Sequence, residues 1–224
     1  MPQILMPDEA ARIRAALLEG QAVTSLRNWG RILTARLPDT TMAFIHHPLG
    51  FICVPAYRDA AQGICLHVWL PEMIGPMLTT SEVHAHSWNL ASYVLTGQIV
   101  QHLASAEFCP QQPTHRVCTV RTWGDLDYIE PTQQMVRVKP GPEEVIRTDM
   151  SYTLPAGKFH RTEVVTGLTA TIVFAEYLKG PEFTLADPDI RAHSVSREPC
   201  TAQEAAAVRE KLASLGYEAG RHGA

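Results

Sequence analysis

Apolar residues at both ends of the chain recur with the spacing of amphipathic helices. This pattern predicts one helix over residues 7–20, a weaker one over 22–37 and a third over 201–215. Thr201 and Glu204 have the spacing of a capping box, which marks the start of the third helix. Both termini are therefore expected to be helical.

The middle of the chain changes to short runs rich in Val, Ile, Thr, Tyr and Phe, separated by Gly, Pro and Asp. Such runs predict strands, and because no amphipathic helix lies between them, an antiparallel sandwich or barrel is favoured over a βαβ sheet. The polar, proline-punctuated stretch 105–141 predicts a hairpin with a long loop. The expected strands cover residues 44–54, 64–70, 92–103, 116–123, 134–138, 151–154 and 168–178.

These elements predict a single, mainly β domain with helical ends packed on it. We expect a helical N-terminal segment over residues 1–40, a β-barrel over 41–185 and a C-terminal extension with one helix over 186–224. Hydrophobic residues make up 46% of the 224 residues, which is enough for a substantial core.

Charge and cysteine content narrow the class of protein. The 19 Lys and Arg against 23 Asp and Glu give a net charge of −4, which argues against a nucleic-acid or membrane partner. Asp8 and Glu9 occupy the place of a leader's apolar region, so no secretory leader is expected. Five cysteines without a C-x-x-C pair argue against a disulfide scaffold or a cysteine-based zinc site, and favour the cytoplasm.

The ten histidines are the unusual feature of the composition. His84 and His86 would project from the same face of a strand, where two imidazoles can bind one ion. The turn sequence Pro155-Ala-Gly157 places His160 at the start of another strand. A third imidazole from a neighbouring strand would complete a metal site within a small barrel.

Here the chain resembles the cupin superfamily. His84, His86 and Gly97 match the first cupin motif at the correct spacing, and the second motif is matched at Pro155, Gly157 and His160. The resemblance covers roughly residues 63–180. It implies a cupin-like antiparallel β-barrel (a double-stranded β-helix) with a metal near its mouth, and it makes a homodimer the expected assembly.

The departures from the motifs are Leu78, Leu90, Asp149 and Val164. Leu90 stands where many cupins have a glutamate ligand, so the expected metal ligands are His84, His86 and His160 alone. A divalent ion held by neutral imidazoles keeps its full charge and favours anionic or chelating substrates. The three-histidine set resembles the cysteine-dioxygenase branch, which favours Fe(II), while Zn, Ni, Cu and Mn stay open.

Several other residues are candidates for ligand or pocket positions. Glu163 should face away from His160, and His102 should point outward. Surface or turn positions are expected for His46 and His47, with the barrel mouth as the alternative for one of them. A buried, hydrogen-bonded ring is expected for His67. Trp88 and Ser92 share the parity of the histidine pair, which leaves two alternatives for Trp88: a place in the pocket lining or a place in the core. A substrate carboxylate would need an arginine, for which the sequence offers Arg121, Arg137, Arg147 and Arg161.

The leading hypothesis is a metalloenzyme: a non-haem Fe(II) dioxygenase acting on a small anionic or chelating molecule, with the catalytic residues unassigned. The first alternative is a non-redox cupin enzyme (isomerase, lyase or hydrolase) in which the ion acts as a Lewis acid. The second is a cupin that binds a small molecule without turnover. Activity that survives without oxygen would separate the first two.

Overall fold

A computed structural model of the chain describes residues 3–19, 23–37, 44–72, 78–165 and 167–215. Its helices are α1 (Pro7–Leu18), α2 (Val23–Arg36) and α3 (Ala202–Ser214). The three predicted helices are thus confirmed, although residues 20 and 22 at their predicted ends lie outside the described ranges. The capping box is confirmed as well, because the Glu204 N–H donates to Thr201 Oγ1 and the Thr201 N–H donates to the Glu204 carboxylate.

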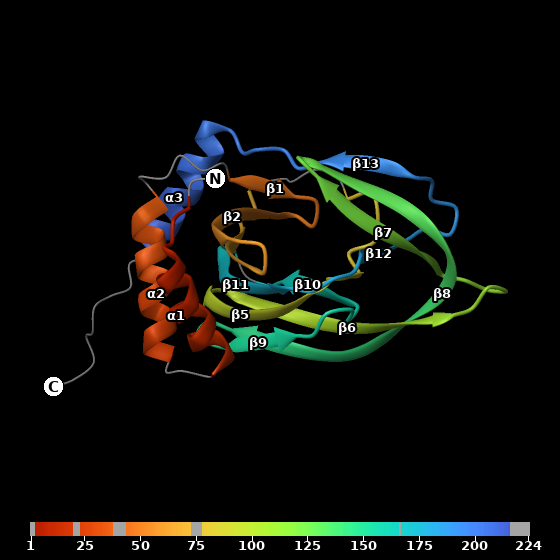
Figure 1. Cartoon of the computed structure of the whole chain (residues 1–224), viewed down its shortest axis with the longest axis horizontal. Helices are drawn as coiled ribbons and strands as arrows, with labels where there is room; N and C mark the ends of the chain where they lie inside the picture. Colours follow the sequence, from red (N-terminus) through yellow and green to blue (C-terminus); the bar gives the residue numbers. More distant parts are fainter. Residues whose placement is uncertain (1–2, 20–22, 38–43, 73–77, 166, 216–224) are drawn as a thin grey trace.

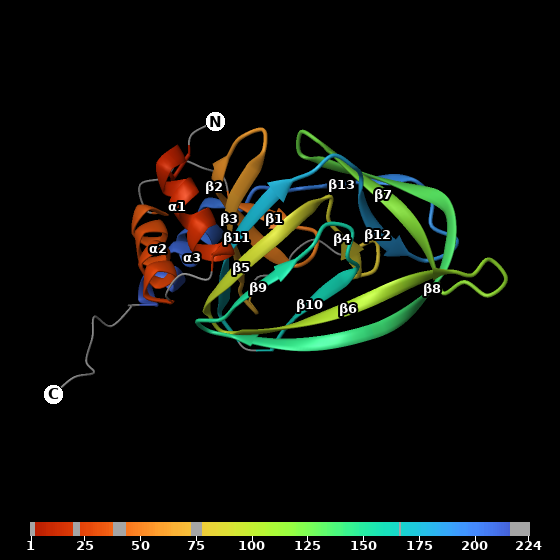
Figure 2. The ribbon, with the colours of Figure 1, turned by 60° about the horizontal axis from the view of Figure 1, so that its bottom comes forward.

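The strands form two antiparallel sheets (Figures 1 and 2). The six-stranded sheet has the order β1 (Ile45–His47), β2 (Phe51–Arg58), β3 (Gln62–Trp69), β11 (Thr169–Tyr177), β5 (Trp88–Thr96) and β9 (Ser151–Leu154). The seven-stranded sheet has the order β13 (His193–Ser196), β8 (Leu126–Arg147), β6 (Gln98–Phe108), β10 (His160–Val164), β4 (His84–Ala85), β12 (Glu182–Ala186) and β7 (His115–Trp123).

The long strand β8 curls the seven-stranded sheet at the end of the molecule away from the helices (Figure 1). Its first half pairs with β7 and its second half with β6. The hairpin predicted within 105–141 is found, because β7 and β8 pair up to Trp123 and Leu126. The long loop is wrong, because most of that stretch is strand. Prolines suggested a loop, but Pro131 and Pro140 lie beside register shifts in the ladders, where a missing N–H is tolerated.

The prediction of a mainly β fold is confirmed, while the expected closed barrel is not found as such. Among the described strands, no ladder joins a strand of one sheet to a strand of the other. The strands therefore form two facing sheets, as in a sandwich, with a cavity lined from both. The predicted run 44–54 is likewise two strands, because a turn at Pro48–Gly50 separates β1 from β2.

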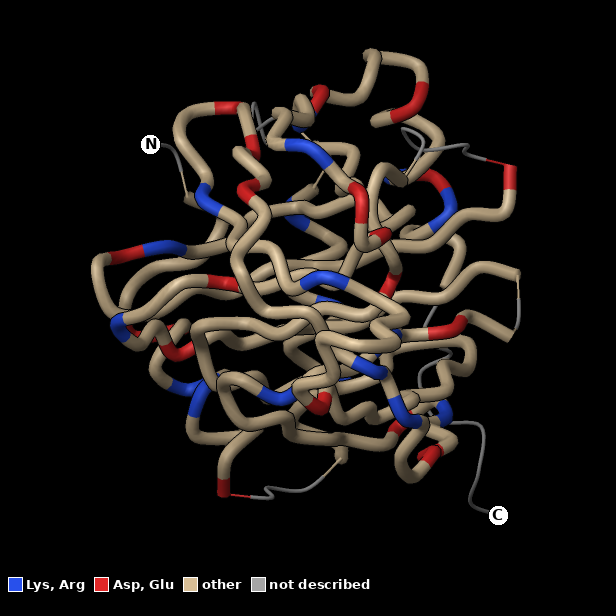
Figure 3. Tube along the Cα trace, turned by 90° about the vertical axis from the view of Figure 1, so that its right-hand side faces the viewer, with Lys and Arg blue, Asp and Glu red and all other residues tan. Residues whose placement is uncertain are grey.

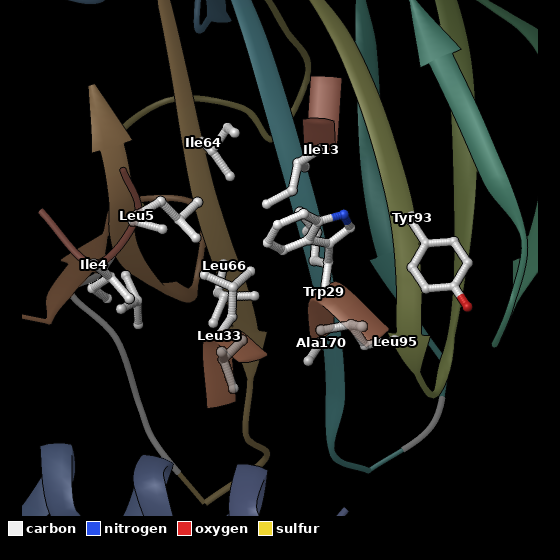
Figure 4. Close-up of a cluster of buried hydrophobic side chains, with 14 of the residues drawn as sticks. Ile4, Leu5, Ile13, Trp29, Leu33, Ile64, Leu66, Tyr93, Leu95 and Ala170 are labelled. Atoms are coloured by element: carbon white, nitrogen blue, oxygen red, sulfur yellow. The ribbon is translucent and has the colours of Figure 1, made fainter. Parts of the chain in front are cut away.

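The main core lies between the six-stranded sheet and the three helices. Alternate residues of each strand point toward the helices, as Ile64 and Leu66 of β3 do, and they pack with Ile13, Trp29 and Leu33 (Figure 4). The intervening residues of the same strands face the cavity. The helices thus stabilise the sheet that forms one wall of the site.

Charged residues of both signs are interspersed along the described chain, and no large region of one sign stands out in the view of Figure 3. This distribution agrees with the small net charge of −4. None of the helices in the described ranges is long and apolar enough to cross a bilayer.

Candidate metal centre

Three histidines from two segments of the chain meet at the cavity. His84 lies in β4, His86 follows this strand, and His160 begins β10. The ladder places His160 directly opposite His84. The ring centroids are 4.7 Å apart for His84 and His86, 4.4 Å for His84 and His160, and 5.1 Å for His86 and His160. The expected meeting of the three rings is therefore found.

One ring nitrogen from each histidine lies within 4.8 Å of the others. Nitrogens bound at 2.0–2.1 Å in a tetrahedral arrangement would be about 3.4 Å apart. Small side-chain rotations bridge this difference. The donor set therefore fits a single divalent cation.

Backbone carbonyls hold two of the rings in a fixed orientation. His84 Nδ1 lies 2.8 Å from the Glu82 carbonyl oxygen, and His160 Nδ1 lies 3.0 Å from that of Lys158. Only a protonated Nδ1 can donate to a carbonyl, so Nε2 keeps its lone pair for a cation. A backbone hydrogen bond also links the turn before His160 to His86, because the Gly157 N–H donates to the His86 carbonyl over 2.8 Å.

Burial keeps the three imidazoles neutral. It lowers the pKa of His84 to about 3, with a smaller contribution from His160, and it lowers the pKa of His160. The pKa of His86 is also well below its usual value, mainly through burial and then through the other two rings. Neutral imidazole is the form that binds metal, so protons do not compete with a cation at pH 7.

Trp88 connects this cluster to a carboxyl group. Its ring stacks on His86 with centroids 3.9 Å apart, and its Nε1 donates to Glu182 Oε1 over 3.0 Å. Burial raises the pKa of Glu182, and the Trp88 hydrogen bond only partly offsets this effect. Sequence reasoning missed Glu182, because β12 reaches the site only through its pairing with β4. Trp88 lines the pocket, which is one of its two expected alternatives.

The cavity around these residues has a volume of about 420 Å³, which suits a small molecule. On its wall the Gln101 Nε2 donates to Tyr152 Oη over 3.1 Å and to Thr162 Oγ1 over 2.8 Å. Gln101 Oε1 is buried without a partner among the described residues. Burial raises the pKa of Tyr152 to about 12, so its hydroxyl keeps its proton and acts as a donor.

The arginines of the cavity are not those expected from the sequence. Arg58 and Arg197 line it, whereas Arg121, Arg137, Arg147 and Arg161 do not. Arg197 is neutralised by Asp127, with Nε 2.8 Å from Oδ2. No carboxylate within the described ranges forms an ion pair with Arg58. Its charge is therefore not balanced by a carboxylate there, although its side chain also hydrogen-bonds to Tyr177.

Several residues considered at the sequence level also have definite positions. Leu90 and Leu78 line the cavity, and Leu90 offers no carboxylate at the glutamate position of the first motif. Thr162 faces the cavity and Glu163 does not, as predicted. Ser92 is fully buried but lies outside the cavity lining. His102 lies away from the cluster, where it pairs with Glu143 and Glu163 at 2.8 and 3.0 Å.

His46 and His67 depart from expectation, whereas His47 takes the alternative place at the cavity. His46, expected at the surface or in a turn, is buried and lies 3.2 Å from Glu204. His47 lines the cavity and stacks on Phe51 with centroids 4.2 Å apart. His67 faces the cavity as well and stacks on the other side of this phenylalanine, rather than lying inside the apolar layer. In each case the partner comes from another segment, which periodicity alone does not reveal.

A second cluster, on the six-stranded sheet, also escaped sequence reasoning. Cys53 of β2 and Cys65 and His67 of β3 each offer a ligand atom, and these atoms lie within 4.8 Å of one another. A hydrogen bond between the two thiols lowers the pKa of Cys65 well below its usual value and raises that of Cys53. No C-x-x-C pair marks this group, because the β2–β3 ladder assembles it.

Comparison with known proteins gives no family for the chain. No family model and no curated protein matches it. Among solved structures it is similar to the crystal structure of hydroquinone 1,2-dioxygenase from Sphingomonas sp. TTNP3 with 4-hydroxybenzoate bound, at 14% sequence identity and a TM-score of 0.34. The match covers 56% of this chain and 66% of that chain, just under two thirds of its length. A likeness this low carries no argument, so the site itself must support any functional conclusion.

Proposed function

We propose that this chain is a cupin-type metalloenzyme, a non-haem Fe(II) dioxygenase acting on a small anionic or chelating molecule. The main support is the close approach of the rings of His84, His86 and His160. These rings are neutral, and two of their Nδ1 atoms donate to backbone carbonyls. In this proposal the three imidazoles hold the cation. A bound Fe(II) would supply a positive charge toward the substrate and the redox chemistry with dioxygen.

The chain's own residues would bind and orient the substrate. Arg58 faces the cavity without a carboxylate partner, so its guanidinium suits an anionic group of the substrate. The Tyr152 hydroxyl, protonated at neutral pH, offers a hydrogen bond to a substrate oxygen. Aromatic side chains such as Phe51, Trp69 and Trp88 provide flat apolar walls and limit the water that enters with the substrate.

Glu182 is a candidate for proton transfer in this site. Its carboxyl group lines the cavity, and burial raises its pKa above the usual value, which favours the protonated form more than in water. Trp88 fixes Oε1 through the 3.0 Å hydrogen bond, which leaves Oε2 available to a substrate. We therefore propose that Oε2 accepts a proton as the substrate binds as an anion.

Metal analysis of protein from iron-supplemented cells tests the proposal. Wild-type protein should hold about one iron per chain, and alanine at position 84, 86 or 160 should lower the iron content by about tenfold or more. His115→Ala is the matched control, because His115 lies in β7 outside the cavity. Oxygen uptake with small anionic thiols and enols should follow the iron content.

Stoichiometric zinc without iron, together with no oxygen uptake for any compound tried, would overturn the dioxygenase proposal. Turnover that continues under anaerobic conditions would instead establish the non-redox alternative. Iron content unaffected by all three alanine variants would refute the assignment of the histidines as ligands.

A further inference from the structure

The cavity wall opposite the three-histidine cluster carries a second set of soft donor atoms. Cys53 of β2 lies directly opposite His67 of β3 in the ladder, and Cys65 precedes His67 by two residues on the same face. The neighbouring residues of β2 and β3, such as Val54 and Leu66, point instead into the core against the helices. Because successive residues of a strand point to opposite faces, the three side chains all lie on the cavity face.

We propose that Cys53, Cys65 and His67 form a second metal site, which takes a soft cation such as Zn²⁺ through two thiolates and one imidazole. Their donor atoms lie within 4.8 Å of one another. Two thiolates bound to zinc at 2.3 Å in a tetrahedral arrangement are about 3.8 Å apart, so the cluster needs little adjustment. The fourth position would face the cavity and take water or an anionic ligand.

A disulfide explains this pair of cysteines less well than a cation does. Cys65 lies opposite Pro55, not opposite Cys53, so the cysteines are diagonal neighbours across the ladder. Diagonal positions have Cβ atoms roughly 7 Å apart, whereas a disulfide requires about 3.5–4.5 Å. A cation between the sulfurs spans the extra distance and uses His67 as well.

Charge also favours a metal at this place. A divalent ion with two thiolates and a neutral imidazole has no net charge, so it would not repel a cation held by the three histidines. Arg58, whose charge acts on both cysteines, favours their ionised form. Ligand type separates the two sites, because thiolates select zinc or copper(I) while a set of three imidazoles accepts iron.

Cobalt titration of the full chain, purified under reducing conditions and freed of metal, tests this site. A Co²⁺ ion bound by thiolate has a strong near-ultraviolet charge-transfer band, which the three-histidine cluster cannot produce. Wild-type protein should develop this band as about one cobalt per chain fills the thiolate site, beyond any cobalt held by the three histidines, and added Zn²⁺ should abolish it. The band should be lost in Cys53→Ser and Cys65→Ser, but kept in His84→Ala and in the control Cys109→Ser.

His67→Ala serves as a control for cysteine variants that lose the band only because they do not fold. It keeps both thiols, so the band should still appear, but at a cobalt concentration about tenfold higher or more. Circular dichroism of each variant shows whether the sheets are intact. A band that survives in a folded Cys53→Ser, Cys65→Ser double variant would overturn the proposal. The absence of the band from wild-type protein would also overturn the proposal. A mass lower by two hydrogens that a reductant restores would do the same, because it marks a disulfide. The band should stay unchanged in a variant that no longer binds iron at the three histidines. The proposed dioxygenase function and the proposed thiolate site can therefore be refuted independently.

Discussion

Acid should destabilise the metal-free protein through its buried histidines, and His84 allows the size of the effect to be worked out. Burial lowers the pKa of this residue from 6.5 to about 3 in the folded state. The unfolded chain therefore binds a proton below pH 6.5, whereas the folded chain does so only near pH 3. Stability that is fully present above pH 6.5 is lost progressively as the pH falls toward 3.

Between pH 7 and pH 5 this difference amounts to about 2 kcal/mol for His84, at 1.36 kcal/mol per pKa unit. The value is an upper one, because the ring faces the cavity and water there lowers the cost of its charge. His86 and His160 act in the same direction, since burial lowers their pKa values too.

Urea unfolding at pH 7 and pH 5 with excess chelator measures this effect. His84→Gln should lose about 2 kcal/mol less than wild-type protein between the two pH values, while the control His115→Gln should lose as much as wild type. Equal losses in wild type and His84→Gln would refute the reasoning. Added divalent metal should stabilise wild-type protein more at pH 7 than at pH 5, because protons compete for the imidazoles.

Three further substitutions test the fold around the site by urea unfolding. Thr201→Ala removes the capping box of α3 and should cost about 1 kcal/mol; a loss of only a few tenths would contradict this role. Gly63→Ala places a methyl group against the Tyr177 hydroxyl and should cost about 1–3 kcal/mol, which Tyr177→Phe should partly restore; no restoration would argue against this collision. Asp127→Ala leaves Arg197 without its carboxylate and should cost about 3 kcal/mol, whereas an unchanged midpoint would show that the pair contributes nothing.

Local patterns in the sequence predicted most of the elements correctly. The helices follow from the spacing of apolar residues and from the capping box at Thr201, both of which lie within one or two turns of chain. The strands follow from β-branched runs. The largest error is β8, a strand of 22 residues that its prolines made look like a loop. Bulges beside Pro131 and Pro140 allow these residues in the sheet, and a bulge depends on the partner strand.

The sequence by itself determined the residues of the three-histidine cluster and the face on which each strand residue lies. His84 and His86 share a strand face through their spacing, and Pro155 and Gly157 determine the turn before His160. These relations span only a few residues, so periodicity and turn chemistry are sufficient to predict them.

Only the tertiary structure decided which side chains join that cluster around the cavity. Arg58, Glu182 and the pair Cys53 and Cys65 come from strands whose neighbours are set by ladder pairing, and the pairing places β12 beside β4 and β2 beside β3. Strand order depends on how two sheets and three helices bury their apolar faces together, which is a property of the whole chain. For the same reason, the four arginines that the sequence offered do not line the cavity, and the two that line it were not predicted.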